Sequence, residues 1–277
     1  MPLSAMYEII GPARAAGRGV GAFNVIGVEH AEAIVTGAEA AHAPVVLQIS
    51  ENCAAYHGAL APVGRACVAI ARSAAVPVAV HLDHATSTEL VQEAAGLGFG
   101  SVMYDASKLR YAHNVKATAE VARWCQPRGL WVEAELGEID GKNGVHSPVA
   151  RTVPGEAADY VAATGVDALA VAVGSSHAML TRDAVLDFGL IGAIRRAVDV
   201  PLVLHGSSGV PDRDLAAAIG AGLTKINIAT QLNKVFTAAI RRCLADDAAM
   251  VDPRAYGAAG RQALAEEVAR LLGVIRA

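Results

Sequence analysis

Three histidines lie at or just beyond the ends of short apolar runs in this sequence. His84 follows Asp83 at the end of "PVAVHLD", His177 comes shortly after "ALAVAVG", and His205 ends "PLVLH". Imidazole is a good ligand for Zn²⁺, and a catalytic zinc usually takes three protein ligands and leaves one position open. A single histidine is more often a hydrogen-bonded structural residue. If the three runs are strands that end at one edge of a sheet, however, the histidines predict a catalytic zinc site.

Acidic residues stand at the same strand ends. Asp105 ends "GSVMYD", Glu135 lies near the end of "LWVEAEL", and Asp83 directly precedes His84. A carboxylate next in sequence to a zinc ligand stays within reach of a metal-bound substrate and can act as a general base. We therefore expect Asp83 to move a proton. His81, two residues earlier, is expected to point into the interior of the fold and to be structural.

Two glycine- and serine-containing stretches indicate phosphate binding. "HGSSG" (205–209) follows the seventh apolar run and "NIATQ" (227–231) follows the eighth. After the last two strands of a barrel, backbone N–H groups and helix N-termini often hold a phosphate. Helix capping explains Ser208 or Thr230 alone about as well. Together, the two stretches predict a phosphorylated substrate.

The elements that must position these residues follow a regular order. Eight short, β-branched apolar runs predict strands, and the Ala-rich segments between them have helical periodicity. The runs are 19–25, 44–50, 77–83, 100–105, 130–136, 168–174, 201–207 and 225–230. This order predicts an α/β fold, a (β/α)8 TIM barrel formed by one domain over residues 1–277, whose strand ends meet at one face. An open doubly wound sheet is the alternative.

Two segments depart from the repeat. Residues 137–154 are too long and too polar for an ordinary loop, and such loops in compact domains are more often functional than structural. Residues 252–275 predict a turn and an extra C-terminal amphipathic helix. This helix would either cap the barrel or contribute to a subunit contact.

Composition excludes several classes of partner. The chain is 53% hydrophobic but only 4% aromatic, as expected for helices packed on parallel strands. A net charge of -4 without a basic run argues against nucleic acid and anionic membranes. The four cysteines form no CxxC pair, which fits reduced thiols. No signal peptide or long uncharged apolar stretch occurs, so we expect a soluble cytoplasmic protein.

Six motifs together resemble a known family. They are "HLDHA", "SVMYDAS", "VEAELGE", "GVDALAVAVGSSH", "VPLVLHGSSGVP" and "TKINIATQL". In this order they are similar to the successive motifs of the class II, metal-dependent fructose-bisphosphate and tagatose-bisphosphate aldolases. The resemblance runs from about residue 19 to residue 257, nearly the whole chain. It implies a TIM barrel with a catalytic zinc ion.

The resemblance also assigns roles to residues. It implies that His84, His177 and His205 bind the catalytic zinc, and that Asp83 exchanges the proton of the substrate's C4 hydroxyl. Acids that bind a second or alternate metal position are matched by Asp105 and Glu135. The positions that match substrate-binding residues are Asn24, Ser50, Ala178, Gly206, Ser207, Ser208, Asn227, Ile228, Ala229, Thr230 and Arg254. Of these, residues 206–208 and 227–230 match the cradle for dihydroxyacetone phosphate, and Arg254 matches an arginine that binds the far phosphate.

The sequence departs from the family in two places. The family usually has glycine, an aromatic residue and a lysine after the strand-6 histidine, whereas this chain has "HAMLTR", with Ala178 and Arg182. The phosphate clamp and any bound monovalent cation can therefore differ from those of the family. In relatives the loop after "EAELG" carries acids that exchange a proton at the enediolate carbon. Glu138 and Asp140 are the candidates here, and a solvated loop with incidental charges is the alternative.

These observations lead to one functional hypothesis and several alternatives. The hypothesis is a zinc-dependent aldolase that reversibly cleaves fructose 1,6-bisphosphate, or its tagatose epimer, to dihydroxyacetone phosphate and glyceraldehyde 3-phosphate. Zn²⁺ can stabilise the negative charge left by cleavage as a Lewis acid, so no lysine Schiff base is needed. Another ketose 1-phosphate, a non-catalytic phosphosugar-binding subunit and a zinc hydrolase are the alternatives. The resemblance also implies a homodimer or homotetramer.

Overall fold

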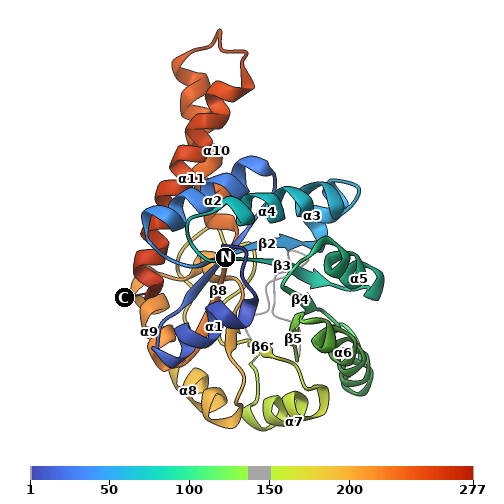
Figure 1. Ribbon diagram of the computed structural model, residues 1–277. Helices are drawn as coiled ribbons and strands as arrows, with labels where there is room; N and C mark the ends of the chain where they lie inside the picture. The colour runs from blue at the N-terminus through green and yellow to red at the C-terminus, as the bar shows by residue number, and fades with distance from the viewer. Residues whose placement is uncertain (1, 137–150, 277) are drawn as a thin grey trace.

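Eight parallel strands form a closed barrel in the computed structural model, which describes residues 2–136 and 151–276 (Figure 1). The strands are β1 (Val20–Asn24), β2 (Val45–Ser50), β3 (Val78–Ala85), β4 (Ser101–Tyr104), β5 (Trp131–Glu135), β6 (Ala168–Ala170), β7 (Leu202–Leu204) and β8 (Leu223–Ile228). Each strand pairs with its neighbour in sequence, and β1 also pairs with β8. That last pairing excludes the open sheet and confirms the predicted TIM barrel.

The strands form where the chain is apolar and β-branched because both of their faces are buried. Helices cover the outer faces, and the inner faces lie in the barrel interior. In β2 every residue except the last is buried. The register between β2 and β3 places Ser50 beside Asp83. Strand ends that were separate in sequence therefore meet at one face of the barrel, which is where barrel enzymes place their chemistry.

The sixth and seventh strands are shorter than the sequence predicts. Each spans three residues, so residues 171–174 and 205–207 belong to connecting segments. Gly174 shows why the chain turns early. Its φ is 119°, and a Cβ at this position would lie 2.1 Å from the backbone oxygen of Val185. Only glycine fits this turn without a shift of the backbone.

Helices surround the barrel as predicted. Between the strands lie α2 (Val28–Ala40), α3 (Glu51–Tyr56), α4 (Ala61–Ser73), α5 (Thr88–Leu97), α6 (Tyr111–Cys125), α7 (Pro154–Thr164), α8 (Phe188–Ala197) and α9 (Asp212–Ala221), with 3-10 turns η1 (Gln126–Arg128) and η2 (Ser207–Gly209). Ser87 and Asp187 cap the N-termini of α5 and α8 through their side chains. Gly98 and Gly165 end α5 and α7 in the left-handed conformation, as helix C-termini commonly do.

An N-terminal helix that the sequence analysis did not predict fills the N-terminal end of the barrel. This helix, α1 (Met6–Ala15), lies in front of the barrel in Figure 1. Its buried face consists of Met6, Ile9, Ile10 and Ala13, which pack with inward residues of the strands. The helix is short and has a proline at position 12, so its hydrophobic pattern alone is a weak signal.

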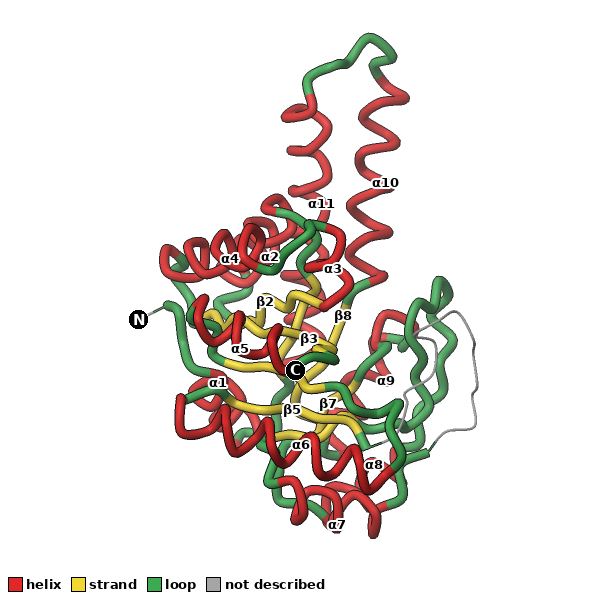
Figure 2. Tube along the Cα trace, turned by 90° about the vertical axis from the view of Figure 1, so that its right-hand side faces the viewer, coloured by secondary structure: helices red, strands yellow, loops and turns green. Residues whose placement is uncertain are grey.

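The last two helices extend from the barrel as an antiparallel hairpin (Figures 1 and 2). They are α10 (Thr230–Asp246) and α11 (Pro253–Arg276), and they pack against each other. The later part of α11 returns to the barrel, where Leu264, Val268 and Leu272 are buried against the core. The predicted C-terminal helix is confirmed, and it packs on α2 and α9 instead of capping the barrel. Among residues 2–136 and 151–276, no helix has both the length and the apolar character that a membrane crossing requires.

Candidate active site

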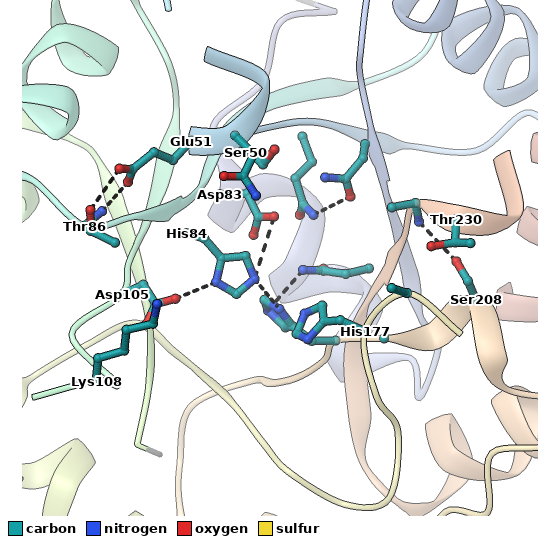
Figure 3. A pocket seen from close by; sticks show the side chains of 18 residues that line it. Ser50, Glu51, Asp83, His84, Thr86, Asp105, Lys108, His177, Ser208 and Thr230 are labelled. Atoms are coloured by element: carbon teal, nitrogen blue, oxygen red, sulfur yellow. Dashed lines mark hydrogen bonds and ion pairs between the residues drawn. The ribbon is translucent and has the colours of Figure 1, made fainter. Parts of the chain in front are cut away.

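A cavity of about 540 Å³ lies at the C-terminal ends of the strands (Figure 3). We call it the pocket, and its size is typical of small-molecule sites. The residues that line it are Asn24, Gln48, Ser50, Glu51, Asn52, Asp83, His84, Thr86, Asp105, Lys108, His177, Ala178, His205, Gly206, Ser208, Asn227, Ala229 and Thr230. Most of the residues expected from the sequence are among them.

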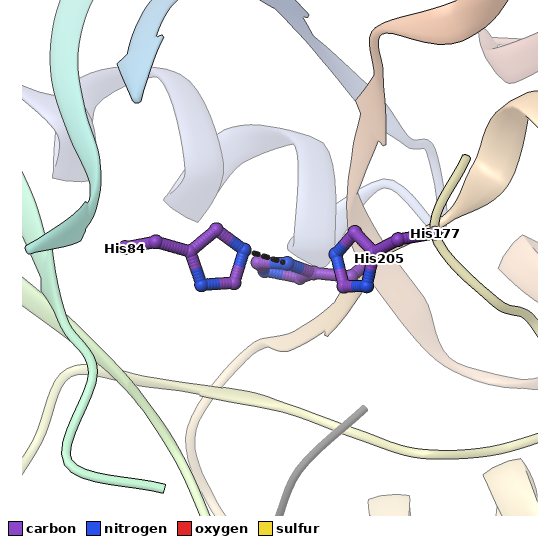
Figure 4. A group of neighbouring side chains, drawn as sticks. All are labelled: His84, His177 and His205. Carbon is purple, nitrogen blue, oxygen red and sulfur yellow. Dashed lines mark hydrogen bonds between the residues drawn. The ribbon is translucent and has the colours of Figure 1, made fainter. Parts of the chain in front are cut away.

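The three predicted zinc ligands converge in the pocket (Figure 4). His84 comes from β3, His177 follows β6 and His205 follows β7. Each ring offers a nitrogen, and the three nitrogens lie within 4.8 Å of one another. This spacing is small enough for one ion to contact all three. The structure therefore confirms that these three strand ends meet at one face of the barrel.

The hydrogen bonds behind two of these rings fix which nitrogens face each other. His84 Nδ1 lies 2.7 Å from Asp105 Oδ2, and His205 Nε2 lies 2.9 Å from Glu133 Oε1. Carboxylates only accept, so these ring nitrogens carry the protons. The opposite nitrogens, His84 Nε2 and His205 Nδ1, are 3.0 Å apart and present lone pairs to each other when both rings are neutral.

This arrangement fits a divalent metal ion. Two lone pairs at 3.0 Å repel each other unless a cation contacts both. Burial, together with the neighbouring His84, holds the pKa of His205 well below its usual value, so the ring is neutral and able to coordinate. Carboxylates behind ligating imidazoles are a common feature of zinc sites. The donor set therefore suits Zn²⁺.

A second group of ligands shares one of these histidines. One ligand atom each from His84, Asp105 and Glu135 lie within 4.8 Å of one another. The structure thus brings Asp105 and Glu135, the residues that the resemblance assigns to a second or alternate metal position, close to His84.

Asp83 and His84 are consecutive, yet both side chains line the pocket. Neighbouring strand residues normally point to opposite faces. Here the pairing of β3 with β4 shifts register between Leu82 and Ala85, and His84 has a φ of 54°, in the left-handed region. The irregularity turns His84 to the same side as Asp83. A strand can thus place a carboxylate and a metal ligand side by side.

The Asp83 carboxylate is buried with one oxygen unpaired. Its side chain is 5% exposed, and Oδ1 has no hydrogen-bond partner among the described residues. The other oxygen, Oδ2, lies 4.0 Å from His84 Nε2. Buried polar atoms almost always have a partner, so an unpaired one in a pocket indicates a ligand group that completes it. A substrate hydroxyl would do so.

The expected phosphate cradle lies at the other side of the pocket. Gly206, with a φ of 68°, tolerates no side chain, because a Cβ would lie 2.4 Å from the backbone oxygen of Ser176. The N-terminus of α10 begins at Thr230, which also lines the pocket. Helix N-termini present backbone N–H groups and partial positive charge to anions. Ser208 Oγ accepts from the backbone N–H groups of Ala229 and Gln231, so its side chain acts as a cap.

Several predicted residues are not brought into the pocket. Ser207 Oγ donates to the backbone oxygen of Leu204, and the Ile228 side chain is part of the hydrophobic core. These two residues could therefore contact a substrate only through their backbone groups. Arg254 lies at the start of α11, with its side chain 90% exposed and paired with Asp252, outside the described lining of the pocket. Glu138 and Asp140 lie outside the described residues.

The departures from the family pattern have local explanations. Ala178 adopts a φ of 58°, a conformation that favours the glycine usual in the family. Arg182 donates to the backbone oxygen of Val210 and pairs with Asp212, so it is occupied away from the pocket. The arginine does not take the place of the family lysine in this arrangement.

Apart from His81, the sequence analysis missed a layer of polar residues beneath the pocket. Side chains two residues apart in a strand point to the same face. Each residue of the layer precedes a strand-end polar residue by two: Gln48 before Ser50, His81 before Asp83, Glu133 before Glu135, and Lys225 before Asn227. This spacing is the signal that could have found them. His81 is buried as expected and bonds to Ser101 Oγ on β4.

Comparison with known proteins identifies the family of this chain. The family model for class-II fructose-bisphosphate aldolases matches residues 4–277. The chain belongs to this family. This aldolase is 38% identical over 268 residues to a fructose-bisphosphate aldolase from Geobacillus stearothermophilus. The aligned region covers 95% of this chain and 93% of that protein. It is 36% identical over 272 residues to one from Staphylococcus epidermidis, over 97% and 95% of the two chains.

A solved structure also superposes on this aldolase. The crystal structure of the YdjI aldolase from Escherichia coli K12 matches it with a TM-score of 0.87 and 30% identity, covering 99% of this chain and 97% of that one. The comparisons thus agree with the resemblance expected from the six motifs.

Proposed function

We propose that this aldolase uses Zn²⁺ to cleave a ketose bisphosphate reversibly, in the cytoplasm, to dihydroxyacetone phosphate and glyceraldehyde 3-phosphate. Fructose 1,6-bisphosphate is the first candidate substrate, because the relatives carry that name, and its tagatose epimer is the second. The observation that carries the proposal is the convergence of three histidine nitrogens next to the unpaired oxygen of Asp83.

Each group of the pocket has a role in this reaction. Zn²⁺, when bound by His84, His177 and His205, would supply Lewis-acid stabilisation of the negative charge that develops as the C3–C4 bond breaks. Asp83 takes the proton of the C4 hydroxyl during cleavage and returns it during synthesis. Glu138 or Asp140 is proposed to protonate the carbon that cleavage leaves on the triose phosphate.

The donor phosphate is proposed to lie in the cradle. Gly206 leaves space for a close approach, and the N-terminus of α10, which begins at Thr230, presents partial positive charge to an anion. Asn24 and Asn227 line the pocket beside it. The Asn227 Oδ1 atom is buried and lacks a partner in the described part of the chain, so it can accept from a substrate hydroxyl.

The far phosphate is proposed to be bound by Arg254 of another subunit. In its own chain Arg254 lies on the projecting α10–α11 hairpin and pairs only with a nearby aspartate in the described residues. A homodimer or homotetramer in which this hairpin reaches across would bring the guanidinium to a neighbouring pocket. Guanidinium groups bind phosphate through paired hydrogen bonds.

A cleavage assay tests the proposed reaction. The purified chain is given fructose and tagatose 1,6-bisphosphates and ketose 1-phosphates, and the products are identified before and after treatment with EDTA. We expect triose phosphate from a bisphosphate, loss of activity with EDTA, and recovery with Zn²⁺. Activity that EDTA leaves intact would remove the metal mechanism. Release of inorganic phosphate would identify a hydrolase, and binding without cleavage would identify a phosphosugar-binding subunit.

Combining two impaired variants tests the role of Arg254. We expect Arg254→Ala to raise KM for bisphosphates and to leave KM for a ketose 1-phosphate unchanged. Coexpression of Arg254→Ala with Asp83→Asn should restore part of the activity, because a mixed oligomer contains one pocket with both residues intact. If the coexpressed pair shows only the sum of its separate activities, Arg254 does not serve a neighbouring pocket.

A further inference from the structure

A fully buried ion pair lies directly beneath the three histidines. Lys225 Nζ of β8 is 2.8 Å from Glu133 Oε2 of β5, and both side chains are completely buried. Removing two charges from water is costly, and apolar residues of similar size are often as stable at such positions. The pair is therefore poorly explained by stability alone.

The two oxygens of Glu133 connect this pair to the metal ligands. Oε2 accepts from Lys225, and Oε1 lies 2.9 Å from His205 Nε2. Lys225 also donates to Gln48 Oε1 at 3.1 Å, which fixes the ammonium from a second side. These contacts orient Glu133 so that one oxygen faces Lys225 and the other faces the imidazole of His205.

The position of the proton on the His205 ring decides whether His205 and His84 can bind the same metal ion. With the proton on Nε2, the lone pair of His205 Nδ1 faces His84 Nε2, 3.0 Å away, so one cation placed between the rings can contact both nitrogens. With the proton on Nδ1, His205 would instead donate to His84 and block both lone pairs. Only the first tautomer, which we call the open tautomer, prepares the site for an ion. The second, with the proton on Nδ1, is the blocked tautomer.

Two neighbours of His205 favour different tautomers. Asn227 Nδ2 lies 3.1 Å from the same Nε2 and, as a donor, suits only the blocked tautomer. Glu133 accepts from Nε2 and suits the open one. A hydrogen bond to a carboxylate is about twice as strong as one between neutral groups, so the bond from His205 to Glu133 outweighs the bond from Asn227. Lys225 holds the other oxygen of this carboxylate in a fully buried ion pair, which fixes its orientation.

We propose that Glu133, held in place by Lys225, is a positioning residue that sets the tautomer of His205 and thereby tightens the binding of a divalent metal ion. The proposal rests on the proposed metal centre. Glu133 itself is separated from the ion by the His205 ring and takes no part in the bond cleavage. Partners of this kind behind a ligating histidine typically change metal affinity by about 10- to 100-fold.

The test measures zinc affinity by competition with a fluorescent chelator, without substrate. Glu133→Gln keeps the shape but directs its carbonyl oxygen to Lys225 and its amide N–H to His205, which favours the blocked tautomer. The double variant Glu133→Leu with Lys225→Met removes both charges and leaves Asn227 as the remaining polar neighbour of Nε2. We expect both variants to bind zinc about 10- to 100-fold more weakly than the unmodified chain.

A matched control separates positioning from general stability. Thr164→Val removes a buried hydrogen bond, from Thr164 Oγ1 to the backbone oxygen of Tyr160 in α7, away from the pocket. It should lower the melting temperature and leave zinc affinity unchanged. If folded Glu133→Gln binds zinc as tightly as the unmodified chain, the proposal is overturned. Should the double variant fail to fold, Glu133→Gln alone decides. If the unmodified chain itself binds no zinc, the proposed metal centre fails first.

Discussion

At its N-terminal end the barrel is filled with apolar side chains, whereas at its C-terminal end the same strands carry histidines, carboxylates and an aspartate oxygen that no described residue contacts through a hydrogen bond. The first end is closed by Met6, Ile9 and Ile10 of α1. The second opens into the pocket and is lined mostly by polar residues. Between them lies the buried polar layer that includes Lys225 and Glu133.

This difference shows that stability and chemistry are separated along the barrel axis. Packing at the N-terminal end stabilises the fold, and the C-terminal end presents polar groups to the pocket, where a ligand can bind them. Substitutions at the two ends should therefore affect different measurements.

The largest effect is expected from Asp83→Asn at the polar end. The amide keeps the shape of the side chain but cannot take a proton, so kcat should fall by about 10²- to 10⁴-fold. Steady-state kinetics and zinc titration check this, with zinc affinity and melting temperature unchanged. Asp167→Asn is the control, because Asp167 is a half-buried carboxylate that accepts from the backbone N–H of Val132 away from the pocket. It should alter stability and leave kcat intact.

The next effect is expected from Ile10→Ala at the apolar end. Ile10 is 1% exposed, and removal of a buried isoleucine side chain to Ala typically lowers the free energy of unfolding by about 2–5 kcal/mol. Denaturant titration should show this loss, and zinc affinity and kcat should stay at their original values. Tyr7→Ala, on the exposed side of the same helix, should cost less than about 0.5 kcal/mol. A fall in zinc affinity with Ile10→Ala would show that the two ends are coupled.

A smaller effect is expected from Ser208→Ala, because Ser208 caps the N-terminus of α10 and also lies in the proposed phosphate cradle. Ser208→Ala removes the hydroxyl that accepts from Ala229 and Gln231, and loss of a helix cap costs about 1 kcal/mol. Ser87→Ala removes the equivalent cap of α5, away from the pocket. Both variants should lose similar stability, but only Ser208→Ala should raise KM for the phosphorylated substrate. Equal kinetics in the two variants would mean that the cap does not shape the cradle.

The sequence predicted the barrel and most of the site because both depend on short patterns. Short apolar runs, separated by helical segments, predict the strands. Polar residues at the ends of these runs, such as His84 and His205, predict the pocket. The bulge that brings Asp83 and His84 to one face depends on pairing with β4, which local sequence does not encode. Lys225 and Glu133 are far apart in sequence, so their ion pair appears only once the strands are closed into a barrel. The direction of the α10–α11 hairpin likewise depends on packing against α2, and this is why Arg254 lies away from the pocket of its own chain.

The smallest effect is expected from Ala178→Gly at the rim of the polar end. Ala178 has a φ of 58°, and the left-handed conformation costs an L-residue roughly 1–2 kcal/mol, whereas glycine loses about 0.5–1 kcal/mol of chain entropy on folding. The free energy of unfolding should therefore rise by no more than about 1 kcal/mol. His42→Gly, at a φ of 47° in a remote loop, should give a similar gain. If Ala178→Gly also weakens zinc binding while His42→Gly does not, the strained alanine helps to hold His177 in place, and strain at the polar end serves the metal site at the expense of stability.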